Sequence, residues 1–218
     1  VVSQFRIEGT VESVSPIGNG LINETLRVKT VDANTPDYIL QRINNAIFTD
    51  VDLLQHNIEL VTDHIRHKLM EKGETDIERK CLRFVQAKDG KTYYKDADNL
   101  YWRVSVFIPN AVTKEEVNPE SAFCCGETFG NFQNMLVDLK EPLGETIPDF
   151  HNMELRLRQL REAVSADKAG RVASVKDMIA ELESYADEMC LAERLYREGA
   201  LPKRICHCDT KVNNMMFD

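Results

Sequence analysis

The sequence has no long hydrophobic run. No stretch approaches the roughly 18 apolar residues that a membrane-spanning helix needs. The first residues, Val1 to Gln4, do not show the charged-then-apolar pattern of a signal peptide. We therefore expect no membrane partner. Because the sequence does not begin with Met, we also expect it to be part of a longer chain.

An excess of basic residues is also absent. The 27 Lys and Arg residues are outnumbered by 36 Asp and Glu residues, which gives a net charge of −9. Nucleic acids and anionic membranes select proteins with a basic face, so we expect no nucleic-acid partner. Hydrophobic residues make up 43% and charged residues 29%, a composition typical of a folded globular chain.

The six cysteines do not form a C-x-x-C motif. They stand at positions 81, 124, 125, 190, 206 and 208. Adjacent and alternate pairs have poor geometry for disulfides, which favours reduced thiols and a cytoplasmic location. Cys206-His207-Cys208 is a weak zinc candidate, because consecutive residues point to different sides of an extended chain and no second cluster completes the set.

The most informative segment is 205–218. It reads H-x-D-x-K-x-x-N, from His207 through Asp209 and Lys211 to Asn214. This spacing resembles the catalytic loop of the protein-kinase-like phosphotransferases, in which an Asp handles the acceptor hydroxyl and an Asn five residues later holds magnesium. On that interpretation Lys211 lies against the transferring phosphate and His207 braces the loop. The alternative is a polar turn between a helix and a strand.

The beginning of the chain predicts two strands around a glycine turn. Segments 11–14 and 25–30 alternate apolar and polar residues. Between them, Gly18, Asn19, Gly20 and Asn23 are candidates for a loop that turns backbone N–H groups toward a phosphate. A plain hairpin turn explains the same residues equally well.

A strand over 38–44 and a helix over about 50–72 follow. The helix is predicted from apolar residues recurring every three or four positions. Arg42 in the strand is the candidate cation for nucleotide phosphates. Glu59 in the helix is a candidate partner for Arg42, as the corresponding pair is in kinases, although a solvated surface Glu is nearly as plausible.

Residues 80–110 are expected to form a hairpin, 84–87 with 92–94, and a long strand that ends at Pro109. An interlobe hinge is expected there, with Phe107 and Ile108 nearest to an adenine. Helices are predicted after Asn118, over 153–164 and, as one long element, over 175–198. The predicted fold is α+β and two-lobed: an N-lobe, 1–108, with an antiparallel sheet and one helix, and a helical C-lobe, 109–218.

Taken together, the chain resembles the phosphotransferase enzyme family of aminoglycoside phosphotransferases and choline kinases, and within it is most similar to the N-acetylhexosamine 1-kinases. The segments that carry the resemblance are 16–23, 39–44, 101–104, Gly126 with 129–133, 147–151 and 207–218. The resemblance implies ATP and Mg²⁺ as cofactors, Asp209 as base, Asn214 as magnesium ligand, and an amino sugar as acceptor. Choline, ethanolamine or an aminoglycoside is the alternative acceptor.

Two positions depart from that family. Leu21 stands where some sugar kinases have a His, and the second magnesium-binding Asp would follow after Asp218. We therefore expect these 218 residues alone to be inactive. A nucleotide-binding module without turnover, and a helical interaction protein with a β-rich head, remain as rival classes. The oligomeric state is open.

Overall fold

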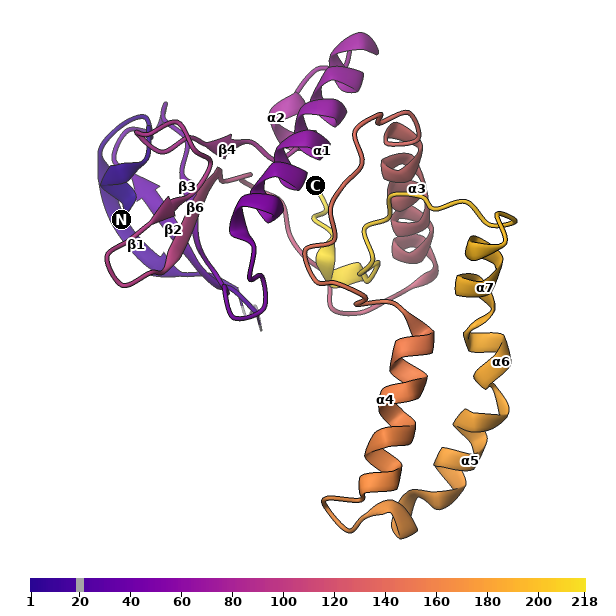
Figure 1. The fold of residues 1–218 in the computed structure, drawn as a ribbon. Helices are drawn as coiled ribbons and strands as arrows, with labels where there is room; N and C mark the ends of the chain where they lie inside the picture. The colour runs from indigo at the N-terminus through magenta and orange to yellow at the C-terminus, as the bar shows by residue number, and fades with distance from the viewer. Residues whose placement is uncertain (19–21) are drawn as a thin grey trace. The chain divides into compact units, whose positions relative to one another are not determined.

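The computed structural model describes residues 1–18 and 22–218. Its contacts group the chain into two units. The first comprises 1–146 with 205–218, and the second comprises 147–204. The predicted boundary between an N-lobe and a C-lobe, at residue 108, is a functional division. Grouping residues by their contacts does not test it, and it stays a prediction. The fold is α+β, and each unit is considered separately (Figure 1).

The first unit is built on an antiparallel sheet of order β1-β2-β3-β6-β4, with β5 also paired to β6. The strands at 11–16, 24–30, 38–43 and 101–106 confirm the strands predicted over 11–14, 25–30 and 38–44 and the long strand predicted to end at Pro109. The bounds are β1 Val11–Pro16, β2 Glu24–Thr30, β3 Tyr38–Ile43, β4 Phe84–Val85, β5 Tyr94–Lys95 and β6 Tyr101–Val106.

The predicted hairpin between 84–87 and 92–94 is wrong. A tight turn is present, in which the Ala87 amide donates to the Lys91 carbonyl at 2.7 Å. However, β4 and β5 both pair with β6 rather than with each other. Since β3 pairs along the whole of β6, the two short strands follow one another on its other edge. Each short strand gains more stability by pairing with the long strand β6 than it would gain by pairing with the other two-residue strand.

The two faces of the sheet have different partners because successive side chains of a strand point to opposite faces. One face carries Val28, Tyr38, Leu40 and Val104, which form a buried core with Phe5 from the segment after the 3₁₀ helix Val2–Gln4. The other face carries Ile43, which packs with Val51 and Tyr93. The helix α1 lies on this second face (Figure 1).

Helix α1 spans Val51–Glu71 and confirms the helix predicted over about 50–72. Its N-cap is Asp50, whose side chain accepts a hydrogen bond from the Leu53 amide at 2.9 Å. Ile65 and Leu69, near its end, pack with Cys81 and Leu136 in a separate hydrophobic cluster. The apolar stripe of the helix is therefore used at both ends, on the sheet and on the helical part.

The helical part of the first unit contains α2 Ile77–Lys80 and α3 Pro119–Met135. Asn118 and Ser121 form a reciprocal capping box at the start of α3, and Pro119 occupies the first helical turn, as predicted. Segment 205–218 returns to this part of the molecule and includes the 3₁₀ helix Val212–Asn214. Ile205 packs into the cluster around Leu136.

The second unit is a pair of helical arms. Its elements are α4 Met153–Ala166, the 3₁₀ helix Val172–Val175, α5 Lys176–Ser184, α6 Ala186–Met189 and α7 Leu191–Arg197. The prediction of one long helix over 175–198 is wrong. At Ser184 the hydroxyl bonds the Glu181 carbonyl at 2.6 Å, which competes with the helical backbone bonds. The Tyr185 amide then donates to the Leu182 carbonyl, three residues back rather than four.

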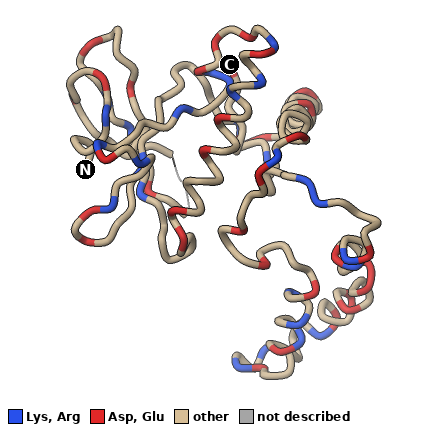
Figure 2. The backbone as a smooth tube through the Cα atoms, turned by 45° about the horizontal axis from the view of Figure 1, so that its top comes forward, with Lys and Arg blue, Asp and Glu red and all other residues tan. Residues whose placement is uncertain are grey.

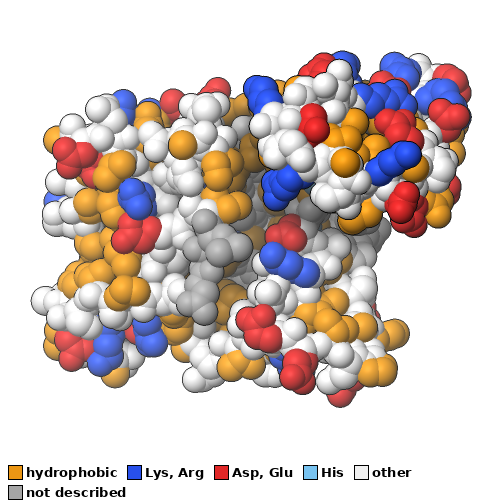
Figure 3. Space-filling view, turned by 90° about the horizontal axis from the view of Figure 1, so that it is seen from below, with side chains coloured by type: hydrophobic (Ala, Val, Ile, Leu, Met, Phe, Trp, Pro, Cys, Tyr) orange, Lys and Arg blue, Asp and Glu red, His pale blue; other side chains and the backbone are white. Residues whose placement is uncertain are grey.

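Charges of both signs are mixed along the chain (Figure 2), and on the face shown in Figure 3 they are scattered among hydrophobic and uncharged side chains. Within the described residues, no helix combines the length and the apolar character needed to cross a bilayer.

Candidate functional site

Asp209, Lys211 and Asn214 form a compact polar cluster in segment 205–218. The Asn214 side-chain amide donates to the Asp209 carboxylate at 2.6 Å and to the Asp209 carbonyl at 2.9 Å. The Lys211 ammonium lies 3.4 Å from the same carboxylate. The structure thus brings together three of the four residues that the motif singles out.

The electrostatics of this cluster favour an ionised Asp209. The hydrogen bond from Asn214 is the main reason that the pKa of Asp209 lies below its usual value, and the charge of Lys211 acts in the same direction. The carboxylate is 59% exposed, so a dissolved molecule can reach it. A charged, accessible carboxylate is what orientation of an acceptor hydroxyl requires.

The loop is fixed at several points. The His207 ring lies 5.3 Å from the Phe129 ring and 6.2 Å from the Phe132 ring, both in α3. Phe217 exchanges two backbone hydrogen bonds with Val112, at 2.8 and 2.9 Å. These contacts place His207 where a brace would lie, although that role stays a prediction.

Cys208, immediately before Asp209, has a left-handed backbone with φ of +65°. This conformation is uncommon for a residue with a side chain and is often found at functional positions, where the fold imposes it. Here it turns the chain just before the carboxylate. Burial raises the pKa of the Cys208 thiol, so it stays protonated near neutral pH.

The glycine turn is only partly described. Gly18 has φ of +74°, and no atom of the described residues lies within 4 Å of where a Cβ would stand. Asn23 accepts a hydrogen bond from the Asn44 amide at 2.9 Å, which ties the turn to the end of β3. The predicted site residues Asn19 and Gly20 lie outside the described residues.

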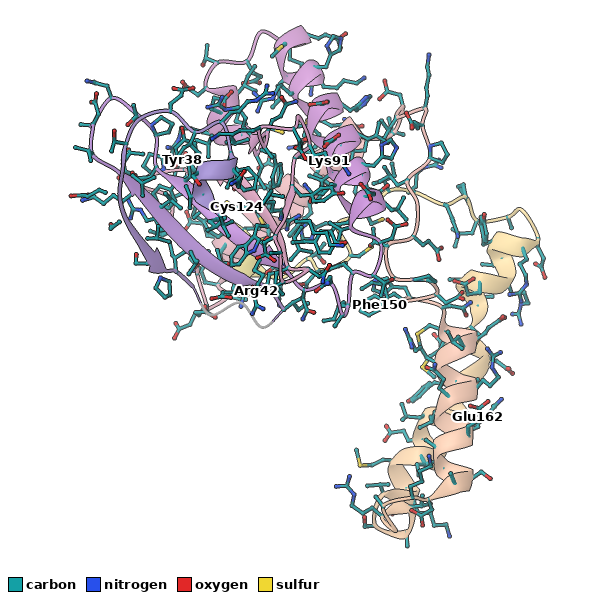
Figure 4. All side chains as sticks on the ribbon, turned by 60° about the vertical axis from the view of Figure 1, so that its left-hand side comes forward. Tyr38, Arg42, Lys91, Cys124, Phe150 and Glu162 are labelled. Carbon is teal, nitrogen blue, oxygen red and sulfur yellow. The ribbon has the colours of Figure 1, made fainter. Side chains whose placement is uncertain are left out.

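Arg42 and Glu59 are not brought together. Arg42 bonds Glu24 on the neighbouring strand at 2.8 Å, whereas Glu59 accepts a hydrogen bond from the Thr92 hydroxyl. The reason is strand alternation, because Arg42 shares its face with Tyr38 and Leu40, away from α1. Tyr38 and Arg42 lie at opposite ends of β3 (Figure 4).

The residue that does meet α1 is Arg103, from β6, which none of the sequence motifs predicts as a site residue. Its guanidinium donates to the Gln41 amide oxygen at 2.6 and 2.9 Å and to that of Gln55 at 3.1 Å. Burial lowers the pKa of Arg103 to about 10, so it is charged at neutral pH. Alternation places Gln41 on the α1 side of β3, but only the pairing of β3 with β6 shows that Arg103 lies beside it.

Phe107 and Ile108 follow β6, as expected of a hinge, and both are partly buried. The Phe107 ring lies under the Arg27 guanidinium at 4.2 Å. Phe107, but not Ile108, borders a cavity of about 670 Å³ that also contacts Lys29, Asp37 and Pro109. A cavity of this size is within the range of small-ligand sites.

Oxygen atoms, rather than sulfur, are the candidate metal ligands. The described residues hold no group of three or more His, Cys, Asp and Glu side chains that could bind a metal ion. Asn214 uses its amide nitrogen toward Asp209, so its amide oxygen is directed elsewhere. A carboxylate and an amide oxygen suit Mg²⁺, which prefers oxygen ligands and retains several waters.

Comparison with known proteins identifies the fold and the family. The fold is that of the protein-kinase-like enzymes, an antiparallel sheet with one long helix followed by a helical part and a polar loop. A model of the phosphotransferase enzyme family matches residues 13–218. The chain belongs to that family.

Two solved structures share the fold. One is a spectinomycin phosphotransferase in complex with ADP and spectinomycin, with a TM-score of 0.55 and 13% identity; the match covers 97% of this chain and 62% of that one. The other is an aminoglycoside phosphotransferase from Alicyclobacillus acidocaldarius, with a TM-score of 0.53 and 20% identity, covering 88% and 52%. The chain therefore spans between half and two thirds of the length of these proteins.

Proposed function

We propose that the protein is an ATP-dependent phosphotransferase that moves the γ-phosphoryl group to a hydroxyl of a small molecule. The observation that carries this proposal is the cluster of Asp209, Lys211 and Asn214, which unites an ionised carboxylate, a cation and an amide in one short loop. Membership of the phosphotransferase enzyme family and the ADP bound to a structural neighbour support it.

In this reaction Asp209 accepts a hydrogen bond from the acceptor hydroxyl, orients its oxygen toward the γ-phosphorus and takes its proton. The bond between acceptor oxygen and phosphorus forms as the bond to the β-phosphate oxygen breaks, and ADP leaves. Lys211 lies beside the carboxylate and stabilises negative charge on the transferred group. Asn214 would hold Mg²⁺, which neutralises charge on the phosphates when bound.

The remaining predicted nucleotide contacts are proposals of the same kind. Phe107 and Ile108 would flank adenine beside the cavity at the hinge, and the turn at Gly18, Asn19, Gly20 and Asn23 would cover the phosphates. Arg42 is retained as a candidate phosphate ligand that must first leave Glu24. The cytoplasm is the proposed location, because it keeps thiols reduced.

For the acceptor we propose the anomeric hydroxyl of an N-acetylhexosamine, from the resemblance to N-acetylhexosamine 1-kinases. An aminoglycoside is the second candidate, favoured by the names of the two structural neighbours. Choline or ethanolamine is the third. The acceptor experiment must therefore include all these classes.

The test is ADP release by the purified full-length protein with Mg-ATP and N-acetylglucosamine, N-acetylgalactosamine, choline or an aminoglycoside. Asp209→Asn should lower turnover by about 100-fold or more, as expected when a general base is removed. Asp63→Asn, on the exposed side of α1, is the control and should retain full turnover. An acceptor-dependent rate that Asp209→Asn leaves intact would refute the role of Asp209.

A further inference from the structure

Arg103 is a buried positive charge with only neutral hydrogen-bond partners. It donates to the amide oxygens of Gln41 and Gln55, and its planar group lies 5.5 Å from the Phe84 ring. Among the described residues, no carboxylate forms an ion pair with it. Proteins rarely desolvate a charge without a counter-ion, because the energetic cost is large. An anion that arrives from outside would satisfy this requirement.

The surroundings of Arg103 fix its orientation. The Gln41 amide nitrogen donates to the Thr25 hydroxyl at 3.0 Å, so its oxygen must face the guanidinium. On the other side, the Gln55 amide nitrogen donates to the Thr92 hydroxyl at 3.1 Å, and that hydroxyl donates to Glu59. A continuous chain of hydrogen bonds thus links β2, β3, β6 and α1.

This series of hydrogen bonds also connects the Arg103 guanidinium to the Glu59 carboxylate without placing the two groups in contact. The carboxylate stabilises the bound orientation of Gln55 through Thr92, yet does not neutralise Arg103. Of the guanidinium N–H groups, three donate to the two glutamines. The other two have no hydrogen bond within residues 1–18 and 22–218, so they keep the capacity to donate to a ligand.

The position of Arg103 on the sheet agrees with a phosphate ligand. On the face toward α1, the row nearest the hinge contains Arg27 and Ile39, and the next row contains Gln41 and Arg103. The two rows are separated by two residues along the strands, about 7 Å. A nucleotide whose base enters the cavity beside Phe107 and extends toward the glycine turn would carry its phosphates past this second row.

We propose that Arg103 is the guanidinium that binds the nucleotide phosphates, held in place by Gln41 and Gln55, and that it performs the task expected of a cation on β3. The inference rests on the proposed function, since it assumes that the site takes ATP. Arg103 suits this task, because its planar fork can donate two parallel hydrogen bonds to one phosphate. Gln41 occupies the place of the β3 cation and orients Arg103 instead.

The experiment compares binding of ATP, adenosine and inorganic tripolyphosphate by calorimetry, for the wild type and for Arg103→Met, Arg103→Lys and Arg42→Met. Arg103→Met should lower the affinity for ATP and for tripolyphosphate by about 10- to 100-fold, the range expected for hydrogen bonds to a charged group, and leave adenosine unchanged. Arg103→Lys should give an intermediate loss for ATP. Arg6→Met, on the core side of the sheet, is the control and should bind as the wild type does.

The outcomes separate the two proposals. If the wild type binds ATP no better than adenosine, the proposed function itself fails. If the wild type prefers ATP and Arg103→Met retains that preference, or if Arg42→Met shows the larger loss, the assignment of Arg103 is overturned. Should Arg103→Met not fold, Arg103→Lys and Gln55→Leu decide: the assignment requires both to weaken ATP and tripolyphosphate more than adenosine.

Discussion

At the scale of single residues, the carboxylates of Asp209 and Asp37 both accept hydrogen bonds, but they differ in how exposed they are. Asp209 is held by Asn214 in an exposed loop, where its charge remains accessible. Asp37 is only 16% exposed and serves the fold. Its carboxylate accepts bonds from Arg27 at 2.6 and 3.1 Å and from the Thr30 amide at 3.0 Å. The exposed carboxylate of Asp209 is suited to a role in catalysis, and the largely buried carboxylate of Asp37 is suited to stabilising the fold.

We therefore predict that Asp37→Asn lowers the free energy of unfolding by about 1–3 kcal/mol at pH 7, the range for hydrogen bonds to a charged group. Desolvation raises the pKa of Asp37, but the Thr30 amide and Arg27 together outweigh it, so the pKa lies below the ordinary value. A lowered folded-state pKa gives stability that is present above the unfolded pKa, about 3.9, and is lost as pH falls through the folded value.

The measurement is urea unfolding of the wild type and Asp37→Asn between pH 3 and 7. The difference between the two proteins should be constant from about pH 5 upward and should shrink below about pH 4. Asp32→Asn, in the neighbouring turn, is a control for charge removal alone. A difference that persists undiminished at pH 3 would contradict the prediction.

How far the sequence predicts the site is clearest at Arg42 and Arg103. Asp209, Lys211 and Asn214 of the motif in 205–218 lie in contact because all three belong to one short loop, and their catalytic roles stay predictions. Predicting which cation of the sheet faces α1 requires knowing whether Gln41 or Arg42 points toward that helix. Alternation puts the two residues on opposite faces, but it does not say which face is the core face. Arg103 comes from β6, 62 positions after its partner Gln41, and that pairing is not local.

At the scale of elements, helices with strong caps were the most predictable. Asp50 and Asn118 each mark the first turn of a helix and bond its free amides. The two-residue strands β4 and β5 were not predictable, because they exist only through pairing with β6. The breaks at Tyr185 and Cys190 were also missed, since the apolar periodicity continues through both.

The capping box of α3 leads to a prediction at this scale. Asn118→Ala should lower the free energy of unfolding by about 1 kcal/mol, because the Ser121 amide loses its acceptor at the helix start. Urea unfolding followed by circular dichroism measures the change. Asn131→Ala, exposed within the same helix, should be neutral or slightly stabilising, since Ala favours helices. Equal losses in the two variants would show that the cap contributes nothing specific.

At the scale of the whole chain, the two units differ in how they are stabilised. The described residues of the first form three hydrophobic clusters around the sheet and α1. In the second, all of 147–204 is described, and Ala186 is the only residue that is buried. Its arms are joined by ion pairs, Arg161 with Glu183 and Arg197 with Glu154, both at 2.7 Å and largely exposed. Exposed pairs of this kind contribute little stability.

We predict from this difference that residues 153–197 open before the sheet does. Opening free energies range from nearly zero in poorly packed segments to the full unfolding free energy in the core. Amide hydrogen exchange followed by mass spectrometry should therefore show protection at least about 100-fold lower in α4 to α7 than in β2, β3 and β6.

Ionic strength tests the cause of that difference. If the ion pairs are the main link between the arms, exchange in α4 to α7 should rise in 0.5 M salt, which screens exposed charges, while exchange in the sheet should not change. Arg161→Gln removes one pair and should have the same effect at low salt, with Arg158→Gln on the same helix as the control. If the amides of 153–197 were protected as strongly as those of the sheet, contacts other than these ion pairs would have to hold the arms together. The lower stability predicted for the arms from their few buried residues would then be wrong.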